Sequence, residues 1–489
     1  MKVAFGKIDI TPPEIALGEA AKIGMAGYGR NHYARGVLDP LMVHGVLIED
    51  VILGNVKKRL LFISIDTLLV PLSVAEYIKK KIQERYRIAP SQVLVHATHT
   101  HSAQEISGMY HWVGYAPAII WGIMFGLNRN DKYITWMAYR IRKMVGEMMQ
   151  NLAPCKVAYT KKTVEEDVII NRRHPERRSK SPLGIIAFKN AENDELIGIM
   201  VNFTMHSTTL GSSNDKLSAD YPGRLVARIE ELTDGRVMAA FFGGAGGDIN
   251  PIATCGTDFD HLTNNQILGQ NGKKEDMERI GNFLGERALQ VAQSIPQDDF
   301  YDRFGYESYV RTIWVPLRDF NHYYASSPMK SAIVKLQNRA LYFAKKYIAL
   351  QVVLAIAGNE DKEPTFPALA IKHRGRYMNC YSKLMYLMLH FSSSQSDKTL
   401  DVSIIGTPGE PFEDVGKYLI DRSLTSPENT IIFQHANDWM AYFFDLNEYT
   451  DSGGMESLEG TTPVAGYHLK KEYAAFLEDI KAGLSIGHY

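Results

Sequence analysis

The chain has 489 residues, of which 45% are hydrophobic and 22% are charged, so it has the composition of an ordinary globular protein and is long for one hydrophobic core. Lys and Arg total 54 and Asp and Glu total 55, which gives no electrostatic reason to expect a nucleic acid or an anionic membrane as a partner. The three cysteines, Cys155, Cys255 and Cys380, lie far apart and imply neither a disulfide framework nor a CxxC zinc motif.

The N-terminal residues, MKVAFGKIDITPPE, lack the charged and then apolar stretches of a secretory signal, so we expect a cytoplasmic protein. The longest apolar stretch, residues 115–127, is too short to span a bilayer and is interrupted by Pro117, so no transmembrane segment is expected. The sequence leaves the oligomeric state open.

Short β-rich runs alternate with helical stretches in the first half of the chain. Residues 60–66 form an apolar run that ends in Asp66, residues 71–86 have helical periodicity, and residues 93–95 are typical of the next strand. This order predicts an α/β fold with a mixed β-sheet core layered with helices. Functional residues in such folds gather at the carboxyl ends of strands, which is where the acid and the histidine-rich HATHTH segment stand.

Later strand-like runs repeat this arrangement, because each leads to a His, Asp, Glu or Tyr residue. The repetition is the clearest indication of a functional site in the sequence. The runs cover residues 197–207, 237–251, 400–419 and 430–443.

Two segments are expected to be long helices. Residues 328–357 have an amphipathic pattern, which favours a helix packed on the sheet over a lid or an interface. Residues 470–485 are typical of a closing helix. No linker or internal repeat divides the chain, so residues 1–489 are predicted to form a single large domain with a helical insertion near 320–375.

His99 and His101 are separated by one residue, and in an extended backbone such side chains point the same way. Both could bind one metal ion, or one could bind it while the other transfers a proton. His206, at the end of a later strand, is the candidate second nitrogen ligand. The alternative is that these histidines and His96 are structural residues held by hydrogen bonds.

Glu410 lies in the stiff turn GTPGEPF, which would fix the direction of its carboxylate. It is a candidate ligand, and the commoner alternative is that it caps the following helix. Residues 171–180 are strongly basic, so Arg172 or Arg173 could hold a substrate oxygen, although a solvated loop is the default.

Four glycines occupy five positions, 243–247, directly before Asp248. Glycine permits a ligand to approach the backbone closely, so Gly244 and Gly247 are predicted to contact substrate. The loop does not match the GxxxxGK[ST] phosphate loop, which argues against a nucleotide. A plain turn is the alternative.

These segments together resemble the catalytic region of the neutral/alkaline non-lysosomal ceramidase family. The similar motifs occur in one order along most of the chain, which makes the resemblance fairly specific. They are GKIDITPPE, MAGYGR, LFISIDTL, THTHS, INRR, NFTMHSTTLGSSNDKLSADYPG, GGDINP, GTPGEPF and NDWMAYFF.

The resemblance implies a ceramidase-like domain that binds one zinc ion per chain through His99, His206, Glu410 and Tyr442, with a water as the remaining ligand. It also implies that His101 and Arg172 lie beside the zinc and contact the scissile group. Hydroxide generated by the zinc would attack the amide carbonyl of a small N-acyl, ceramide-like or other lipid-like substrate.

The chain departs from the family in three places around the substrate. Asn250 replaces a serine of the family's GDVSPN motif, Met455 stands where a family tyrosine is expected, and HSAQE replaces HSGPG. Asp248 and Asn250 are predicted to belong to the catalytic site and Met455 to the substrate site. We also expect no counterpart of the family's C-terminal immunoglobulin-like domain, because residue 489 follows closely on the last of these motifs.

These departures leave alternatives open. The protein could be a zinc-dependent esterase or another hydrolase on the same scaffold, or a non-catalytic zinc-binding homologue. A second metal ion near Asp66 or Asp248 also stays possible at this stage.

Overall fold

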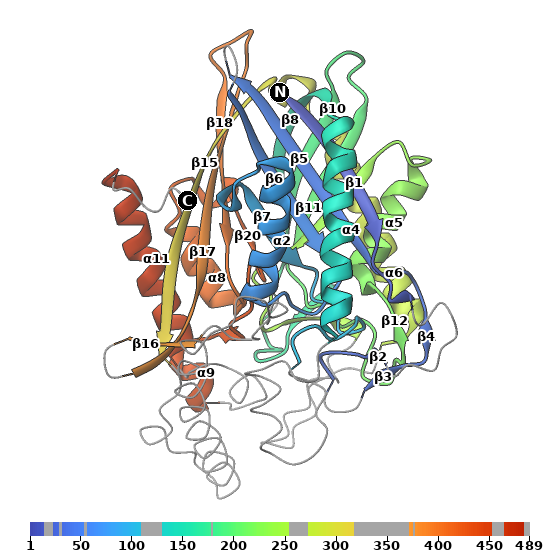
Figure 1. The fold of residues 1–489 in the computed structure, drawn as a ribbon, viewed down its shortest axis with the longest axis vertical. Helices are drawn as coiled ribbons and strands as arrows, with labels where there is room; N and C mark the ends of the chain where they lie inside the picture. Colours follow the sequence, from blue (N-terminus) through green and yellow to red (C-terminus); the bar gives the residue numbers. More distant parts are fainter. Residues whose placement is uncertain are drawn as a thin grey trace, which may run out of the picture.

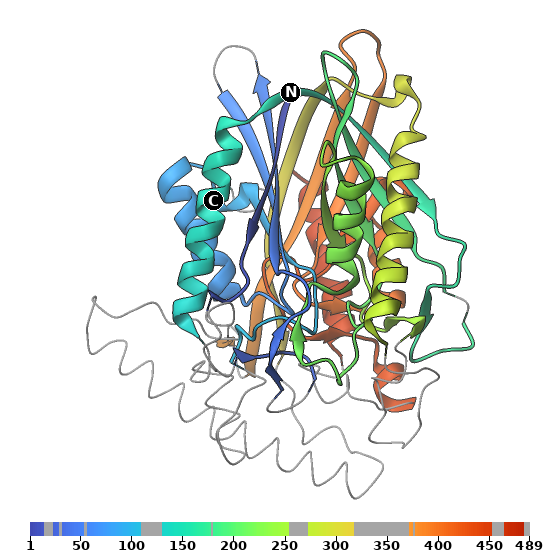
Figure 2. The same ribbon diagram turned by 90° about the vertical axis from the view of Figure 1, so that its right-hand side faces the viewer.

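The computed structural model describes residues 1–13, 23–28, 32–52, 56–108, 130–177, 179–253, 272–316, 371–374, 377–451 and 464–483. In this part of the chain an eight-stranded and a five-stranded β-sheet lie face to face, and helices cover the outer face of each (Figures 1 and 2). The resulting four layers, helix, sheet, sheet, helix, confirm the predicted mixed α/β class and add a second sheet to it. The described residues form no separate immunoglobulin-like domain.

The larger sheet is mixed. Its pairs β11–β13 and β6–β7 are parallel and its other pairs are antiparallel. In spatial order its strands are β13 (Met238–Gly243), β11 (Leu196–Phe203), β10 (Pro182–Asn190), β8 (Ala153–Thr163), β1 (Lys2–Asp9), β5 (Met42–Ile52), β6 (Val56–Ile65) and β7 (Val93–Ala97).

The smaller sheet is built from the last third of the chain. Strands β15 and β17 pair antiparallel along their length, and β18 and β20 pair parallel. Its strands, in order, are β15 (Arg303–Pro316), β17 (Tyr377–Ser392), β18 (Thr399–Gly406) and β20 (Thr430–Phe433), with β16 (Ile371–Arg374) paired to β17.

The apolar runs of the sequence form strands that are buried on both faces. In β6, Leu61 and Ile63 pack under the helices, whereas Leu60 and Phe62 pack between the two sheets. Successive side chains of a strand point to opposite faces, so a strand covered on both sides is mainly apolar, with polar residues such as Ser64 only where they are hydrogen-bonded. This is why residues 60–66 read as a continuous apolar run.

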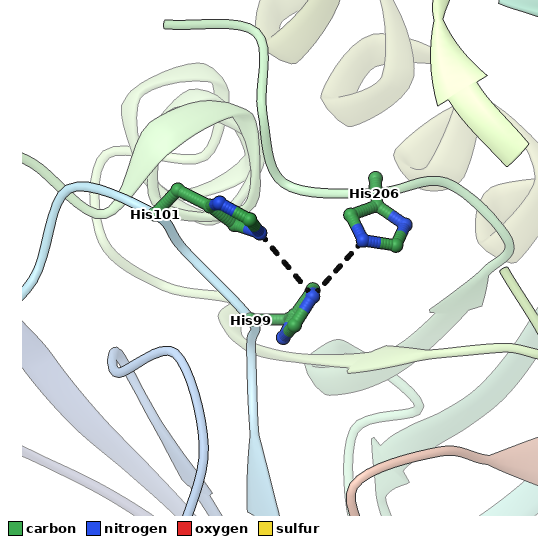
Figure 3. Close-up of side chains that lie close together, drawn as sticks. All are labelled: His99, His101 and His206. Atoms are coloured by element: carbon green, nitrogen blue, oxygen red, sulfur yellow. Dashed lines mark hydrogen bonds between the residues drawn. The ribbon is translucent and has the colours of Figure 1, made fainter. Parts of the chain in front are cut away.

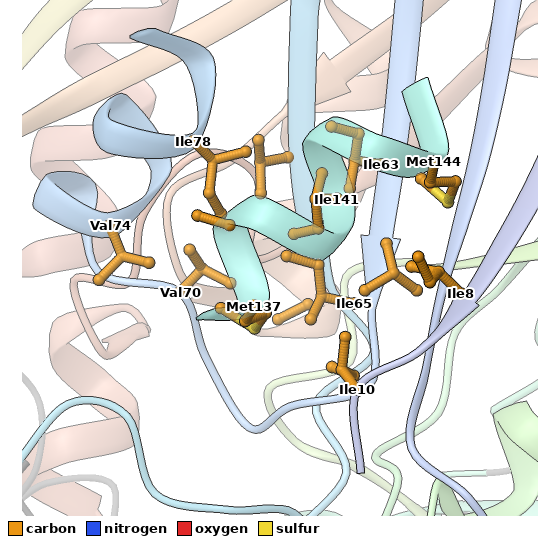
Figure 4. Packing of buried hydrophobic residues seen from close by; sticks show 14 of the residues in the cluster. Ile8, Ile10, Ile63, Ile65, Val70, Val74, Ile78, Met137, Ile141 and Met144 are labelled. Atoms are coloured by element: carbon orange, nitrogen blue, oxygen red, sulfur yellow. The ribbon is translucent and has the colours of Figure 1, made fainter. Parts of the chain in front are cut away.

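Helices complete the outer layers. Ile78 of α2 and Ile141 of α4 face Ile63 of β6 in a cluster of buried apolar side chains (Figure 4). Two further helices, α5 and α6, cover the other half of the larger sheet, and α8 and α11 cover the smaller one. Their bounds are α2 Leu72–Tyr86, α4 Asp131–Gln150, α5 Asp220–Leu232, α6 Lys274–Gln293, α8 Glu413–Asp421 and α11 Ala465–Lys481.

The predicted helix at 71–86 and the closing helix are confirmed by α2 and α11. The strand expected at 197–207 ends earlier, because β11 stops at Phe203, three residues before His206. The expected helix at 328–357 lies outside the described residues, and the described part of the expected insertion, Ile371–Arg374, is a strand. No described helix is both long enough and apolar enough to cross a membrane.

Asp438 connects two segments that lie far apart in the sequence. Its Oδ1 accepts hydrogen bonds of 2.7 Å from the backbone N–H of Leu72, at the start of α2, and from its neighbour Trp439. Because the side chain is completely buried, its pKa rises from 3.8 to about 7. The folded protein therefore binds this proton more tightly than the unfolded chain does.

A raised carboxyl pKa stabilises the fold below pH ~4 and loses that contribution as pH rises through about 7. We expect Asp438→Asn, which keeps the accepting oxygen but cannot ionise, to weaken the fall in stability between pH 4 and 7. The single-group effect is at most about 4 kcal/mol, from a shift of about three pKa units. Thermal unfolding midpoints of metal-free protein across this pH range measure it, with half-exposed Asp215→Asn as control. An unchanged pH slope in the Asp438→Asn variant would contradict the assignment.

Candidate metal centre

The side chains singled out by the sequence meet where strands of both sheets end. His99 and His101 follow β7, and His206 follows β11, both from the larger sheet. Glu410 and Tyr442 follow β18 and β20 of the smaller sheet. They lie in two short strands, β19 (Glu410–Pro411) and β21 (Tyr442–Phe443), that pair in parallel with Glu410 opposite Tyr442. The site is therefore at the carboxyl ends of strands, as expected, but at the seam between two sheets.

The three histidines converge (Figure 3). The Nε2 atom of His99 lies 3.0 Å from Nε2 of His206 and 3.3 Å from Nε2 of His101. The expected reason for the convergence is wrong, because β7 ends at Ala97 and His99 has a left-handed backbone with φ of +64°. Such strain in a non-glycine residue requires strong support from its surroundings and is common at functional sites.

Backbone carbonyl groups fix how two of these rings carry their protons. His99 Nδ1–H donates to the Leu68 oxygen and His206 Nδ1–H donates to the Gly246 oxygen, each at 2.7 Å. A carbonyl can only accept, so in the neutral rings both Nε2 atoms carry lone pairs. Two lone pairs 3.0 Å apart repel each other unless a cation lies between them. Hydrogen bonds of this kind orient the histidine ligands of metal sites.

Glu410 supplies the third donor. Its Oε2 lies 3.4 Å from His99 Nε2 and 3.3 Å from His206 Nε2, and it accepts no hydrogen bond from the described residues. The alternative role as a helix cap is wrong: α8 begins after Phe412, and the N–H of its first residue, Glu413, donates to Asp248 Oδ1 instead. A buried carboxylate oxygen without a hydrogen bond beside two imidazole lone pairs fits a bound cation.

The charge state of this group also fits. Burial alone would raise the pKa of Glu410, but positive charge beside the carboxylate, such as that of a protonated His99, lowers that pKa well below its usual range. A bound cation would supply the same positive charge with both imidazole rings neutral. Burial lowers the pKa of His206, which favours the neutral ring that a metal needs. Two neutral imidazoles and one carboxylate are a donor set typical of catalytic zinc sites.

Arg172 and Tyr442 border the donors. Arg172 is 1% exposed, and its Nη2 donates to the Gly247 oxygen at 2.7 Å and to the Tyr442 hydroxyl at 3.3 Å. Its Nη1 donates to Asn250 Oδ1 at 2.9 Å. The residue that departs from the family motif thus contacts the arginine directly.

The glycine-rich loop has a packing role. A Cβ at Gly244 would lie 2.1 Å from Thr204 Oγ1, and one at Gly247 would lie 2.7 Å from the backbone carbonyl oxygen of Glu410. Their amide groups donate to the carbonyl oxygens of Phe203 and Pro411, so neither amide is left for a substrate. The loop contacts the centre through carbonyl groups instead.

Asp248 is a supporting residue of the site. Its Oδ1 accepts from the Glu413 amide and its Oδ2 accepts from the Asn171 side chain at 2.9 Å, and burial raises its pKa to about 7. It therefore connects α8, which follows Glu410, to β9 (Ile169–Asn171), the strand directly before Arg172. In the described chain no group of three potential ligands surrounds Asp248 or Asp66, so these residues give no support for a second metal ion.

His101 is held from its other side. The ring of Tyr28 lies 4.9 Å from the His101 ring, and a Cβ at Gly27, whose φ is +103°, would lie 2.3 Å from His101 Nδ1. Burial, together with His99 and His206, holds the pKa of His101 well below its usual range. His101 is therefore a neutral ring at the edge of the donor cluster.

The sequence interpretation passed over His435, although it lies two residues after the end of β20. Its ring stacks on that of His99, with centroids 4.1 Å apart and planes inclined by 16°, and neither nitrogen has a hydrogen-bond partner in the described residues. A donor atom of His435 lies within 4.8 Å of donors from His99 and Glu410. An ion held by an imidazole lies in its plane, and these planes are nearly parallel, so one ion cannot bind both rings as they stand.

His96, to which the sequence assigned no chemistry, and Arg173, the alternative to Arg172, both have structural roles. His96 lies between the sheets, where Nε2 accepts from the Gly243 amide at 2.9 Å and Nδ1 pairs with the Ser64 hydroxyl at 3.1 Å. Arg173 turns away from the centre and donates to the Glu448 carbonyl oxygen at 2.7 Å. Met455 lies outside the described residues.

Comparisons with known proteins point in one direction. Residues 1–321 match the family described as neutral/alkaline non-lysosomal ceramidase, N-terminal. The neutral ceramidase of Pseudomonas aeruginosa is 23% identical over 235 residues, which are 45% of this chain and 32%, about a third, of that protein. The crystal structure of that organism's neutral ceramidase has a TM-score of 0.66 at 17% identity and covers 99% of this chain and 75% of its own. A ceramidase complexed with C2 gives the same score and covers 76% of its chain.

Proposed function

Because the chain belongs to the neutral/alkaline non-lysosomal ceramidase family, we propose that it is a zinc-dependent hydrolase that cleaves the amide bond of an N-acyl, ceramide-like or other lipid-like substrate. The observation that carries the proposal is the convergence of His99 Nε2, His206 Nε2 and Glu410 Oε2 within 3.4 Å of one another. The carboxylate oxygen accepts no hydrogen bond from the described residues. Tyr442, paired beside Glu410, is the proposed fourth protein ligand.

When bound, zinc would supply a Lewis acid and a water whose pKa is lowered to about 7. The chain's own residues hold the substrate. Arg172 is a permanent cation beside Tyr442 and would donate to the amide oxygen, where negative charge develops during hydrolysis. Hydrogen bonds from Arg172 to the Asn250 side chain and to the Gly247 carbonyl oxygen keep the guanidinium in place.

His101 is a second donor toward the same oxygen. Since His99 Nε2 carries a lone pair, the 3.3 Å contact requires that His101 Nε2 bears the hydrogen. A neutral His101 would therefore present its Nε2–H group to the substrate oxygen, while its buried Nδ1 faces Gly27 on the opposite side of the ring. The cytoplasmic location expected from the sequence remains a prediction.

Metal analysis combined with an activity assay tests this function. Protein stripped with a chelator and titrated with Zn²⁺ is expected to bind one ion per chain and to hydrolyse N-acyl substrates only when loaded. An ester matched to the amide in acyl chain and head group is the comparison substrate. Turnover of the ester alone would replace the amidase by an esterase, and zinc binding without turnover of either bond would favour a non-catalytic homologue.

A further inference from the structure

The loop of residues 434–441 lies against the donor cluster, because His435 stacks on His99 and Trp439 donates a hydrogen bond to Glu410. It is attached to β7 by Asn437, whose amide donates to the Val95 oxygen at 2.6 Å and whose Oδ1 accepts from the Val95 amide at 3.0 Å. His435, Asn437 and Ala441 all have positive φ, so this short loop stores backbone strain. The strained path places the Trp439 ring, which is 5% exposed, against the metal centre.

Trp439 treats the two oxygens of Glu410 differently. Its Nε1–H donates to Oε1 at 2.7 Å, whereas Oε2 faces His99 and His206 without a hydrogen bond from the described residues. An indole can only donate, so this contact cannot reverse or be exchanged for an acceptor. The Glu410 backbone is fixed as well, because its amide donates to the Ala441 oxygen at 3.0 Å.

We infer that Trp439 is a positioning residue that makes Glu410 a ligand through Oε2 alone. A carboxylate that binds zinc through both oxygens occupies two coordination positions. Catalytic zinc sites keep a position open for water or substrate, and restricting the carboxylate to one oxygen preserves it. The inference rests on the proposed function, since it assigns a role toward the proposed metal ion.

The position of the indole is set by the fold and not by the ion. The Trp439 backbone amide donates to Asp438 Oδ1, and the same oxygen accepts the amide that begins α2. Asp438 therefore ties the Trp439 backbone to the start of α2. The constraint on Glu410 exists before any metal arrives.

Cobalt substitution separates this role from a purely structural one. Trp439→Phe removes the N–H donor and keeps a buried aromatic ring, so Glu410 Oε1 becomes available. We expect the variant to bind one Co²⁺ per chain about 10–100-fold more weakly, the usual cost of losing an outer-shell partner. Its visible absorption should become weaker, because cobalt absorbs less strongly as its coordination number rises. Trp136→Phe, which removes a partly buried indole on α4, is the matched control and should match wild type.

The outcomes distinguish the two proposals. Wild-type protein that binds no Co²⁺ or Zn²⁺ contradicts the proposed function and removes the role of Trp439 with it. Wild-type protein that binds the metal while Trp439→Phe shows the same affinity and spectrum overturns the inference alone. A measurement on the wild-type protein tests the inference even if the Trp439→Phe variant fails to fold. In protein labelled with ¹⁵N-tryptophan, Zn²⁺ should shift at least one slowly exchanging indole N–H signal, and five unshifted indole signals would overturn the inference.

Discussion

Replacing His206 with alanine is expected to abolish zinc binding and amide hydrolysis while leaving the fold in place. The Nε2 atom of His206 is one of three converging donor atoms. Without it, only His99 Nε2 and Glu410 Oε2 of the three remain, and we expect these to bind the ion too weakly. Loss of a residue that only supports a ligand lowers metal affinity by about 10–100-fold, and the loss of His206, a ligand itself, should lower the zinc affinity further. Hydrolysis should fall by about 10³–10⁴-fold, equivalent to about 4.1–5.4 kcal/mol of transition-state stabilisation.

His101→Ala is the informative comparison, because the donor atoms of His101 also lie within 4.8 Å of those of His99 and His206. If His101 contacts substrate, its alanine variant retains one zinc per chain and loses turnover. If it is a ligand in place of Tyr442, the two alanine variants lose zinc equally. Zinc content by mass spectrometry under native conditions and titration against a chelator decide between them, with the half-exposed His390→Ala as control.

Replacing Arg172 with lysine is expected to lower kcat/KM by about 10²–10³-fold without loss of zinc, the range found when one donor to a developing oxyanion is removed. Lysine keeps the positive charge but lacks the planar guanidinium that reaches the Asn250 oxygen and the Tyr442 hydroxyl together. The loss should appear mainly in kcat, since the contact strengthens as charge develops on the substrate oxygen.

The neighbouring residue provides the control for Arg172. Arg173→Lys changes a partly buried arginine that contacts Glu448, so it should leave kcat/KM within a few-fold of wild type. Steady-state kinetics on the N-acyl substrate, with zinc content measured on the same samples, gives both values. Wild-type kinetics in the Arg172→Lys variant would show that the guanidinium does not act on the substrate.

Much of the fold was predictable because its first sheet is covered on both faces. Apolar runs such as residues 60–66 identify buried strands directly, and their order along the chain indicated a mixed α/β core. The smaller sheet was not foreseen. Its long strands β15 and β17 alternate buried apolar with polar or half-buried residues, and their partners stand far apart in sequence. Whether such segments form one layer is decided by their tertiary pairing.

The site shows the same division. His99, His206 and Glu410 could be selected because each follows a strand, and the structure brings their donor atoms together. The detailed geometry could not be derived, since it depends on a left-handed backbone at His99 and on the carbonyl partner of each ring. The stacked His435 was missed for a similar reason: nothing local in its sequence shows which side of the strand end it occupies.

The seam between the sheets has a consequence for how the molecule is made. Val95 and Asn437, which bond across it, are 342 positions apart, and Leu72 and Asp438 are 366 positions apart. Contacts of such separation form late, because the entropy of closing very large loops must be overcome first. A nascent chain of 321 residues would carry His99 and His206 but not Glu410 or Tyr442. The metal centre can therefore assemble only on a chain whose last strands have docked, and a metal that binds only the docked state adds its binding free energy to that final step.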